Sequence, residues 1–438
     1  MNCARNTKSN PLGFKFHWVG AGIGLFAMLG LSGCASSRML DQESDRLFRE
    51  QQYEQAADHL KKGLEAQGEG SRDELLYLMD WGLSLHSAGK YEESTKVLLK
   101  ADAMAEIKDY TSLVNEGATL LTSENLKPYA GEDFEKVLIN TYLSMNFALQ
   151  GDWEGALVEA RRVNTKLRMM VTEGKRNYKQ NAFARYLSAS IYESEGNWND
   201  AYVDYREVYK IEPHIPGLGV DLWRAAKLAG MSEDLEKWDR EYGLSAEDHE
   251  KALIFKNNRE WGEIIVLYEN GISPVKRPRP NFASLPEFFP RSNPVSFANV
   301  VARPLGGVTL ARYEAKTTVL HDIEKTAIEN LDEKYAGMIA KKMAGMVAKE
   351  AMAHQLSKKT SPVVGELFRL IAYASDQADC RSWNLLPRDL QVARIPVPGG
   401  LYTVRLAPQG GPGDWGVHEK TVEVRAGKKV FVNFRFLL

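Results

Sequence analysis

A short phrase recurs three times in the first half of the chain and constrains its fold more than any other feature. It reads GKYEES at 89–94, GDWEGA at 151–156 and GNWNDA at 196–201. Each copy puts glycine first, an aromatic residue two positions later and a small residue at the end. Glycine can end a helix with a positive φ angle, and small side chains let two helices pack closely. The phrases therefore predict tight turns between paired helices.

The spacing of these turns indicates a repeated helix-turn-helix unit. Gly196 and Gly230 stand 34 residues apart, which is the period of the tetratricopeptide repeat (TPR), although longer insertions separate the earlier turns. We therefore expect a TPR-like α-solenoid over residues 34–245, with a degenerate early copy near Tyr53. The irregular spacing leaves open a second interpretation, in which the helical hairpins do not stack into a superhelix.

The first helices of such repeats line a concave groove. In this chain the groove is expected to be mildly apolar and to contain methionines, which suits an extended or helical segment of a partner protein. The alternative is that inserted segments or the C-terminal region fill the groove permanently. The predicted groove residues are Met79, Leu83, His86, Thr141, Met145, Tyr186, Ser190 and Glu193.

The pattern changes in the second half of the chain. Residues 246–375 are expected to form a mixed strand and loop region, with a strand at 264–268 and one long amphipathic helix over 319–358. We expect the methionine-rich face of this helix to pack against neighbouring strands, with a membrane or another helix as the alternative. Residues 376–438 alternate apolar and polar side chains in short runs, which predicts a small sandwich-like β module. The expected fold class is α+β.

Two basic features in this half predict a surface for an anionic ligand such as a glycan. Lys276, Arg277 and Arg279 lie in a proline-rich stretch, and Arg381 precedes Trp383 by two positions. The simpler interpretations are a solvated linker at the first feature and a buried tryptophan that anchors the β module at the second.

The first 34 residues have the parts of a bacterial lipoprotein signal. Positive residues precede a glycine-interrupted apolar run, which ends in Leu31-Ser32-Gly33-Cys34. The pattern predicts removal of residues 1–33 and attachment of fatty acyl chains such as palmitate to Cys34, which would anchor the protein in a membrane. An ordinary signal peptide is the alternative. The signal resembles that of Gram-negative lipoproteins, in which a residue such as Ala35 after the acylated cysteine permits sorting to the outer membrane. This resemblance implies an anchor that faces the periplasm.

The composition gives no support to several classes of function. A net charge of -2 and a pI near 6.5 provide no overall basic surface for nucleic acid. Once Cys34 and the signal are set aside, Cys380 has no cysteine to pair with. The pairs His321–Asp322 and Glu350–His354 lack the third ligand or the nucleophile that a metal or triad site needs. We therefore expect no metal, no cofactor and no enzyme, with an unrecognised catalytic site in residues 250–380 as the alternative.

Several longer phrases carry a resemblance to a known group of proteins. The Leu31–Cys34 motif, GDWEGALVEARR at 151–162, GEDFEK at 131–136 and RSW at 381–383 resemble a family of proteobacterial TPR outer-membrane lipoproteins. Pro398-Gly399-Gly400 before a Tyr-Thr-Val strand is similar to PEGA-type immunoglobulin-like modules. The resemblance implies a non-enzymatic periplasmic scaffold that binds envelope proteins in cell-envelope or peptidoglycan assembly. Direct binding of peptidoglycan or another glycan is the alternative.

Overall fold

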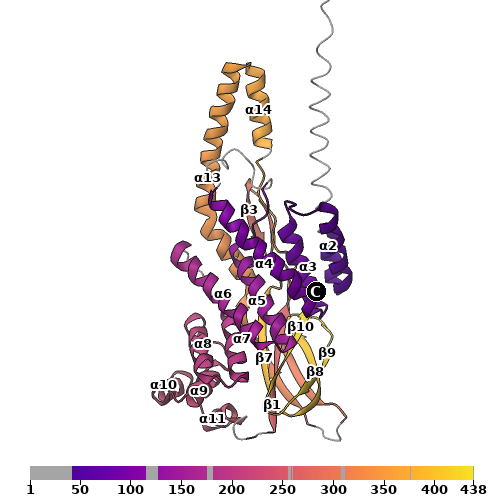
Figure 1. Cartoon of the computed structure of the whole chain (residues 1–438), viewed down its shortest axis with the longest axis vertical. Helices are drawn as coiled ribbons and strands as arrows, with labels where there is room; N and C mark the ends of the chain where they lie inside the picture. Colours follow the sequence, from indigo (N-terminus) through magenta and orange to yellow (C-terminus); the bar gives the residue numbers. More distant parts are fainter. Residues whose placement is uncertain are drawn as a thin grey trace, which may run out of the picture.

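The computed structural model describes residues 42–114, 127–174, 181–254, 258, 260–306, 311–374 and 376–437. Within these ranges the chain forms a helical array, two packed β-sheets and a projecting helical hairpin (Figure 1). The predicted signal segment and Cys34 lie outside the described residues. No helix in these ranges has both the length and the apolar character needed to pass through a bilayer.

The N-terminal half is a TPR-like array of antiparallel helix pairs, as the recurring phrase predicts. The glycines that begin the turns at 89, 151, 196 and 230 all have φ angles between 71 and 79°, the left-handed conformation that glycine adopts without strain. The helices are α2 (Tyr53–Gln67), α3 (Glu74–Ser87), α4 (Tyr91–Val114), α5 (Asp133–Gln150), α6 (Trp153–Gly174), α7 (Ala182–Ser194), α8 (Trp198–Ile211), α9 (Leu218–Ala229), α10 (Ser232–Tyr242) and α11 (Ala246–Ala252).

Small residues set the close approach of the two helices within a pair. The hydroxyl of Ser94 on α4 donates a 2.7 Å hydrogen bond to the carbonyl of Gly82 on α3. A Cβ atom on Gly82 would lie only 2.5 Å from a methyl group of Leu98. The helices can therefore pack this closely only where one of them lacks a side chain.

The second half of the chain forms two four-stranded sheets and a separate hairpin. The first sheet has the strand order β10-β1-β7-β6, the second has the order β5-β4-β8-β9, and β2 pairs with β3. The strands are β1 (Trp261–Asn270), β2 (Val275–Arg279), β3 (Phe282–Phe289), β4 (Phe297–Pro304), β5 (Tyr313–Lys316), β6 (Thr318–Asp322), β7 (Asp389–Pro398), β8 (Gly400–Gln409), β9 (His418–Val424) and β10 (Lys429–Phe436).

The two sheets form one sandwich rather than two modules. Strand β1 pairs in parallel with β10 and antiparallel with β7, and β4 pairs with β8. Side chains such as Val266, Val300 and Val404 fill the space between the sheets. The boundary expected between residues 375 and 376 thus corresponds to no structural boundary, because strands on either side of it pair with each other. The sequence alone could not show these pairings, since a parallel pair distant in the chain leaves no local turn signal.

The long helix is present, but it begins four residues later than expected. Helix α13 runs over Ile323–Lys359 and is followed by α14 (Pro362–Ala374). The residues before it form β6, in which Val319 pairs with Gln391 of β7. Asp322 then caps the helix, because its side chain accepts a 2.9 Å hydrogen bond from the backbone N–H of Lys325. Only the base of α13 packs on the body, where Ile323, Ala327 and Leu331 are buried.

Candidate functional site

The inner face of the helical array is covered by the first sheet of the sandwich. Helix α5 lies against β10 and α7 lies against β6, and one apolar core joins residues of the array and the sheet, including Tyr142, Ile265 and Phe431. Of the two alternatives for the groove, the structure shows the filled one. All eight predicted groove residues are buried: Met79, Leu83, His86, Thr141, Met145, Tyr186, Ser190 and Glu193.

A first buried polar network joins the array to the sheet around Glu269 of β1. Its carboxylate lies 3.0 Å from His86 Nε2 and accepts hydrogen bonds from Tyr142 at 2.7 Å and Asn433 at 2.7 Å. The other ring nitrogen of His86 lies 2.6 Å from the amide oxygen of Asn146. Burial raises the pKa of Glu269, but His86, together with Arg435 and Asn433, outweighs burial and holds the pKa at about 2. Strand β1 thus contacts the inner face of the array through this carboxylate.

A second network surrounds Arg394 of β7. Its guanidinium lies 2.6 Å from Glu193, 2.7 Å from Glu263 and 3.0 Å from Asp221. Arg224 also pairs with Glu193, at 2.6 Å, and Lys429 pairs with Glu193 and Glu263. Although burial raises the pKa of Glu263, Arg394 and Lys429 hold that pKa at about 2. Three carboxylates and three cations therefore neutralise one another between α7, α9 and the sheet.

Sequence reasoning missed the strand half of both networks. Glu263 and Glu269 stand directly before and after the apolar run 264–268. Since side chains alternate along a strand, both carboxylates fall on the same face as Ile265 and Leu267, which is the face toward the helices. Two carboxylates on a buried strand face need cationic or hydrogen-bonding partners. This requirement could have predicted, from the sequence, a polar interface on this face of the strand.

The predicted anionic-ligand surface is not assembled as one patch. Lys276 is buried against Glu132 at 2.5 Å, and Arg279 lies 3.9 Å from Glu287. Arg381 pairs with Asp73 at 2.8 Å and with Asp379 at 2.7 Å. Trp383 is buried against Tyr142, with 5.7 Å between the ring centroids, so the tryptophan anchors the second half of the chain to the helical array. Arg277 and Arg279 are exposed, and Arg277 lines a cavity described below.

Glu135 lies beside Trp383 and is expected to make the stability of the fold depend on pH. It accepts hydrogen bonds from the Trp383 backbone N–H at 2.7 Å and from the Tyr129 hydroxyl at 2.6 Å. Burial and the neighbouring Glu132 raise its pKa from 4.5 to about 7. The folded state therefore holds a proton that the unfolded chain releases between these two pH values, and stability falls as pH rises through that window.

The variant Glu135→Gln removes this titration. Relative to the wild type, its free energy of unfolding should improve by up to roughly 3 kcal/mol between pH 4.5 and 7.5. Urea unfolding of both proteins at several pH values measures the difference, with the exposed Glu233→Gln as control. Parallel curves for the wild type and Glu135→Gln would contradict the predicted pKa.

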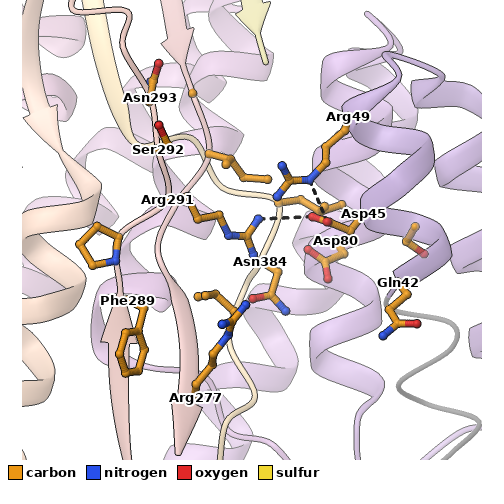
Figure 2. Close-up of a pocket in the computed structure, with 16 residues that line it drawn as sticks. Gln42, Asp45, Arg49, Asp80, Arg277, Phe289, Arg291, Ser292, Asn293 and Asn384 are labelled. Atoms are coloured by element: carbon orange, nitrogen blue, oxygen red, sulfur yellow. Dashed lines mark hydrogen bonds and ion pairs between the residues drawn. The ribbon is translucent and has the colours of Figure 1, made fainter. Parts of the chain in front are cut away.

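An open, polar cavity of about 620 Å³ lies where the first described helical residues, 42–49, meet the β2–β3 hairpin. In Figure 2, Arg49 and Arg291 reach the carboxylate of Asp45 from different segments. The distances are 2.8 Å to Arg49 and 3.3 Å to Arg291. Burial lowers the pKa of Arg291, opposed by the attraction of Asp45. This ion pair fixes the wall of the cavity and ties residues 42–49 to the sandwich.

The other lining groups favour a polar ligand. Arg277 is exposed at the rim, and no described carboxylate lies within ion-pair distance of it. Asn293 and Asn384 supply amide groups, and the Nδ2 atom of Asn293 is buried without a hydrogen-bond partner among the described residues. Three arginines and two aspartates line the cavity, so it carries an excess of positive charge. Such a site can bind the carboxylates and amides of a peptide or an acidic glycan.

No protein-family model matches the chain, and no curated protein matches it in sequence. Solved structures that resemble part of it include the MamA protein, with 13% identity and a TM-score of 0.33 over 50% of this chain and 93% of MamA. Another is a putative kinesin light chain from Podosopora anserina with nearly identical TPR-like repeats, with 15% identity and a TM-score of 0.33 over 49% of this chain and 95% of that one. Similarity at this level settles neither the fold nor the function. In the parts of the chain that the structure describes, no cluster of three or more His, Cys, Asp or Glu side chains could hold a metal ion.

Proposed function

We propose that this protein is a non-catalytic scaffold of the bacterial cell envelope, anchored in the outer membrane by acyl chains on Cys34 and facing the periplasm. The observation that carries the scaffold role is the union of the helical array and the sandwich into one body through buried ion pairs. A body of this kind holds its outer surfaces in fixed relative positions. The cavity at Arg277 and Arg291 is the surface that we assign to a partner protein in envelope or peptidoglycan assembly.

The anchor and the partner site are tested separately. Mass spectrometry of the purified protein should find acyl chains on an N-terminal Cys34, and the Cys34→Ala variant should leave the outer-membrane fraction. An unmodified Cys34 in a protein that still fractionates with the membrane would contradict the anchor while leaving the cavity untouched.

For the partner site, a photoreactive amino acid at Ser292 on the cavity rim is compared with one at Glu236 on α10. Both positions are exposed, so both can accept the probe. In intact cells, Ser292 should give a discrete crosslinked envelope protein that Glu236 does not give. Arg277→Glu in the same protein should weaken this product several-fold, because it reverses the charge at the rim. A product that is unaffected by Arg277→Glu would place the contact elsewhere.

Binding of peptidoglycan is the second candidate function, and the excess positive charge of the same cavity favours it. Purified cell-wall sacculi should then retain the wild type, and Arg277→Glu or added salt should release it. Retention without any Ser292 crosslink would favour the glycan over a protein partner. Absence of both signals would remove the cavity from the proposal.

A further inference from the structure

The helical hairpin α13–α14 projects beyond the body of the molecule (Figure 1). It concentrates exposed apolar side chains to a degree found in no other described segment. Of the 21 large hydrophobic residues that are exposed in the described chain, 11 lie between residues 339 and 373. They are Ile339, Met343, Met346, Val347, Met352, Val363, Val364, Leu367, Leu370, Ile371 and Tyr373. Soluble surfaces rarely gather so many apolar side chains unless something covers them.

The seam of the hairpin explains why the large side chains point outward. Small residues occupy the contact between its helices, where Gly345, Ala353, Gly365 and Ala372 are buried. A Cβ atom on Gly365 would lie 2.7 Å from the carbonyl oxygen of Ala353. The helices therefore approach closely at this position, and the larger Lys349 enters the seam where it donates a 3.2 Å hydrogen bond to the carbonyl of Ala372.

Each helix carries its exposed apolar residues as a stripe. On α13 the stripe is Ile339, Met343, Met346 and Val347, and on α14 it repeats with the same spacing as Val363, Leu367, Leu370 and Ile371. This i, i+4, i+7, i+8 spacing keeps the side chains on one face of a helix. The exposed fractions of these side chains run from 41% for Leu367 to 75% for Val363, so both stripes face solvent.

The charge of the hairpin is opposite to that of the rest of the chain. Residues 340–373 contain five lysines, one arginine and two glutamates, which gives a net charge of +4 in a protein of net charge -2. Arg369 pairs with Glu350 at 2.9 Å, and Asp376, just after the hairpin, pairs with Lys342 and Lys349. Exposed Lys358 and Lys359 stand at the tip, beside Val363. Apolar stripes among basic residues are typical of helices that lie in the interface of an anionic bilayer.

We propose that the α13–α14 hairpin docks on the anionic lipid surface of the membrane to which Cys34 is anchored. The choice of membrane rests on the proposed function, whereas the docking face rests on the hairpin itself. A second copy of the chain fits less well, because it would bring one basic hairpin against another. An anionic lipid surface supplies the opposite charge and can cover stripes on both helices.

The geometry allows the anchor and the hairpin to reach one membrane. Gln42 lies eight positions after Cys34, and eight steps along the chain can span at most about 29 Å. In Figure 1 the described chain begins at the end of the body from which the hairpin projects. The 37 residues of α13 make a helix roughly 55 Å long. Its base is buried on the body as far as Leu331, so the part of α13 beyond Leu331 is the part available to a membrane.

The test uses the acylated protein in vesicles and measures where the hairpin lies. An environment-sensitive fluorophore is attached to a cysteine at Val347 or Leu370, and in a control to one at Val203 on α8, which is 52% exposed. The unsubstituted protein gives the background from Cys380. Nitroxide-bearing lipids should quench the Val347 and Leu370 labels several-fold more than the Val203 label. Quenching should be stronger in vesicles of phosphatidylethanolamine and phosphatidylglycerol than in phosphatidylcholine alone.

Charge reversal gives a second measurement that does not depend on the label. The triple variant Lys341→Glu, Lys358→Glu, Lys359→Glu should lose the preference for phosphatidylglycerol and keep its fold, since these lysines are exposed. Labels at Val347 and Leu370 that stay in water on vesicle-bound, acylated protein would overturn the proposal. Protection of the labels that rises with protein concentration and needs no vesicles would overturn it in favour of self-association. If Cys34 is not acylated, the same labels report binding to added vesicles, so failure of the anchor and failure of the hairpin are distinguishable.

Discussion

Replacement of Arg394 by alanine is expected to cost about 3–5 kcal/mol of unfolding free energy, the usual range when one partner of a buried ion pair is removed. Arg394 lies within 3.0 Å of Glu193, Glu263 and Asp221, all of them buried. Without it, Arg224 and Lys429 remain as the described cations in contact with this cluster. Three carboxylates would then share two cations in a site that excludes water.

Two comparisons make this result specific. Arg405→Ala removes an arginine that pairs with Glu419 on the surface of the second sheet, and it should cost no more than about 1 kcal/mol. Arg394→Lys keeps the charge but loses the forked geometry of the guanidinium. Its free energy of unfolding should therefore lie between those of the wild type and Arg394→Ala. Denaturant unfolding at neutral pH measures all three. A cost for Arg394→Ala no larger than that of Arg405→Ala would show that the ion pairs do not hold the two halves together.

Replacement of Trp383 by alanine should also cost about 3–5 kcal/mol, because it empties a site in the centre of the molecule. Trp383 is 1% exposed, and its ring packs on Tyr142. Its backbone N–H donates to Glu135, so the loop that carries it is held to α5 from two sides. Loss of the ring leaves a cavity that neighbours on both the helices and the sheet cannot close.

A conservative variant separates packing from hydrogen bonding at this position. The indole Nε1 of Trp383 is buried without a hydrogen-bond partner among the described residues. Trp383→Phe should therefore lose much less unfolding free energy than Trp383→Ala. Trp415→Ala is the matched control, because Trp415 is half-buried at the edge of the sandwich and donates to the carbonyl of Gly410. A thermal shift for Trp383→Ala as small as that for Trp415→Ala would contradict the central position of this side chain.

Local patterns were sufficient to predict the helical array but not what covers it. The turn at Gly151 is specified by residues within one phrase, and Tyr186 and Met145 were assigned to the inner face by the repeat spacing alone. Whether that face is open depends on β1 and β10, whose pairing joins distant parts of the chain. Sequence periodicity reports which face of a helix is apolar, and it does not report the partner.

The same limit applies to the hairpin and to the cavity. Met343 and Val347 have the spacing of core residues, yet they are exposed because α13 continues beyond the body. Arg277 was predicted to meet an anionic ligand, but the rest of its site comes from residues 42–49 and 289–293. A site assembled from such distant segments has no single motif that sequence analysis could find.

Hydrogen exchange of the backbone amides tests most directly whether the chain's own sheet fills the groove. We expect the amides of β1 and β10 to exchange as slowly as those of α5 and α7, because all four elements share one buried interface and open together. The amides of α10, where Trp238 is the buried residue, should exchange faster. Rapid exchange of β1 and β10 while α5 and α7 stay protected would mean that the sheet leaves the array, and the groove would then be open to a partner.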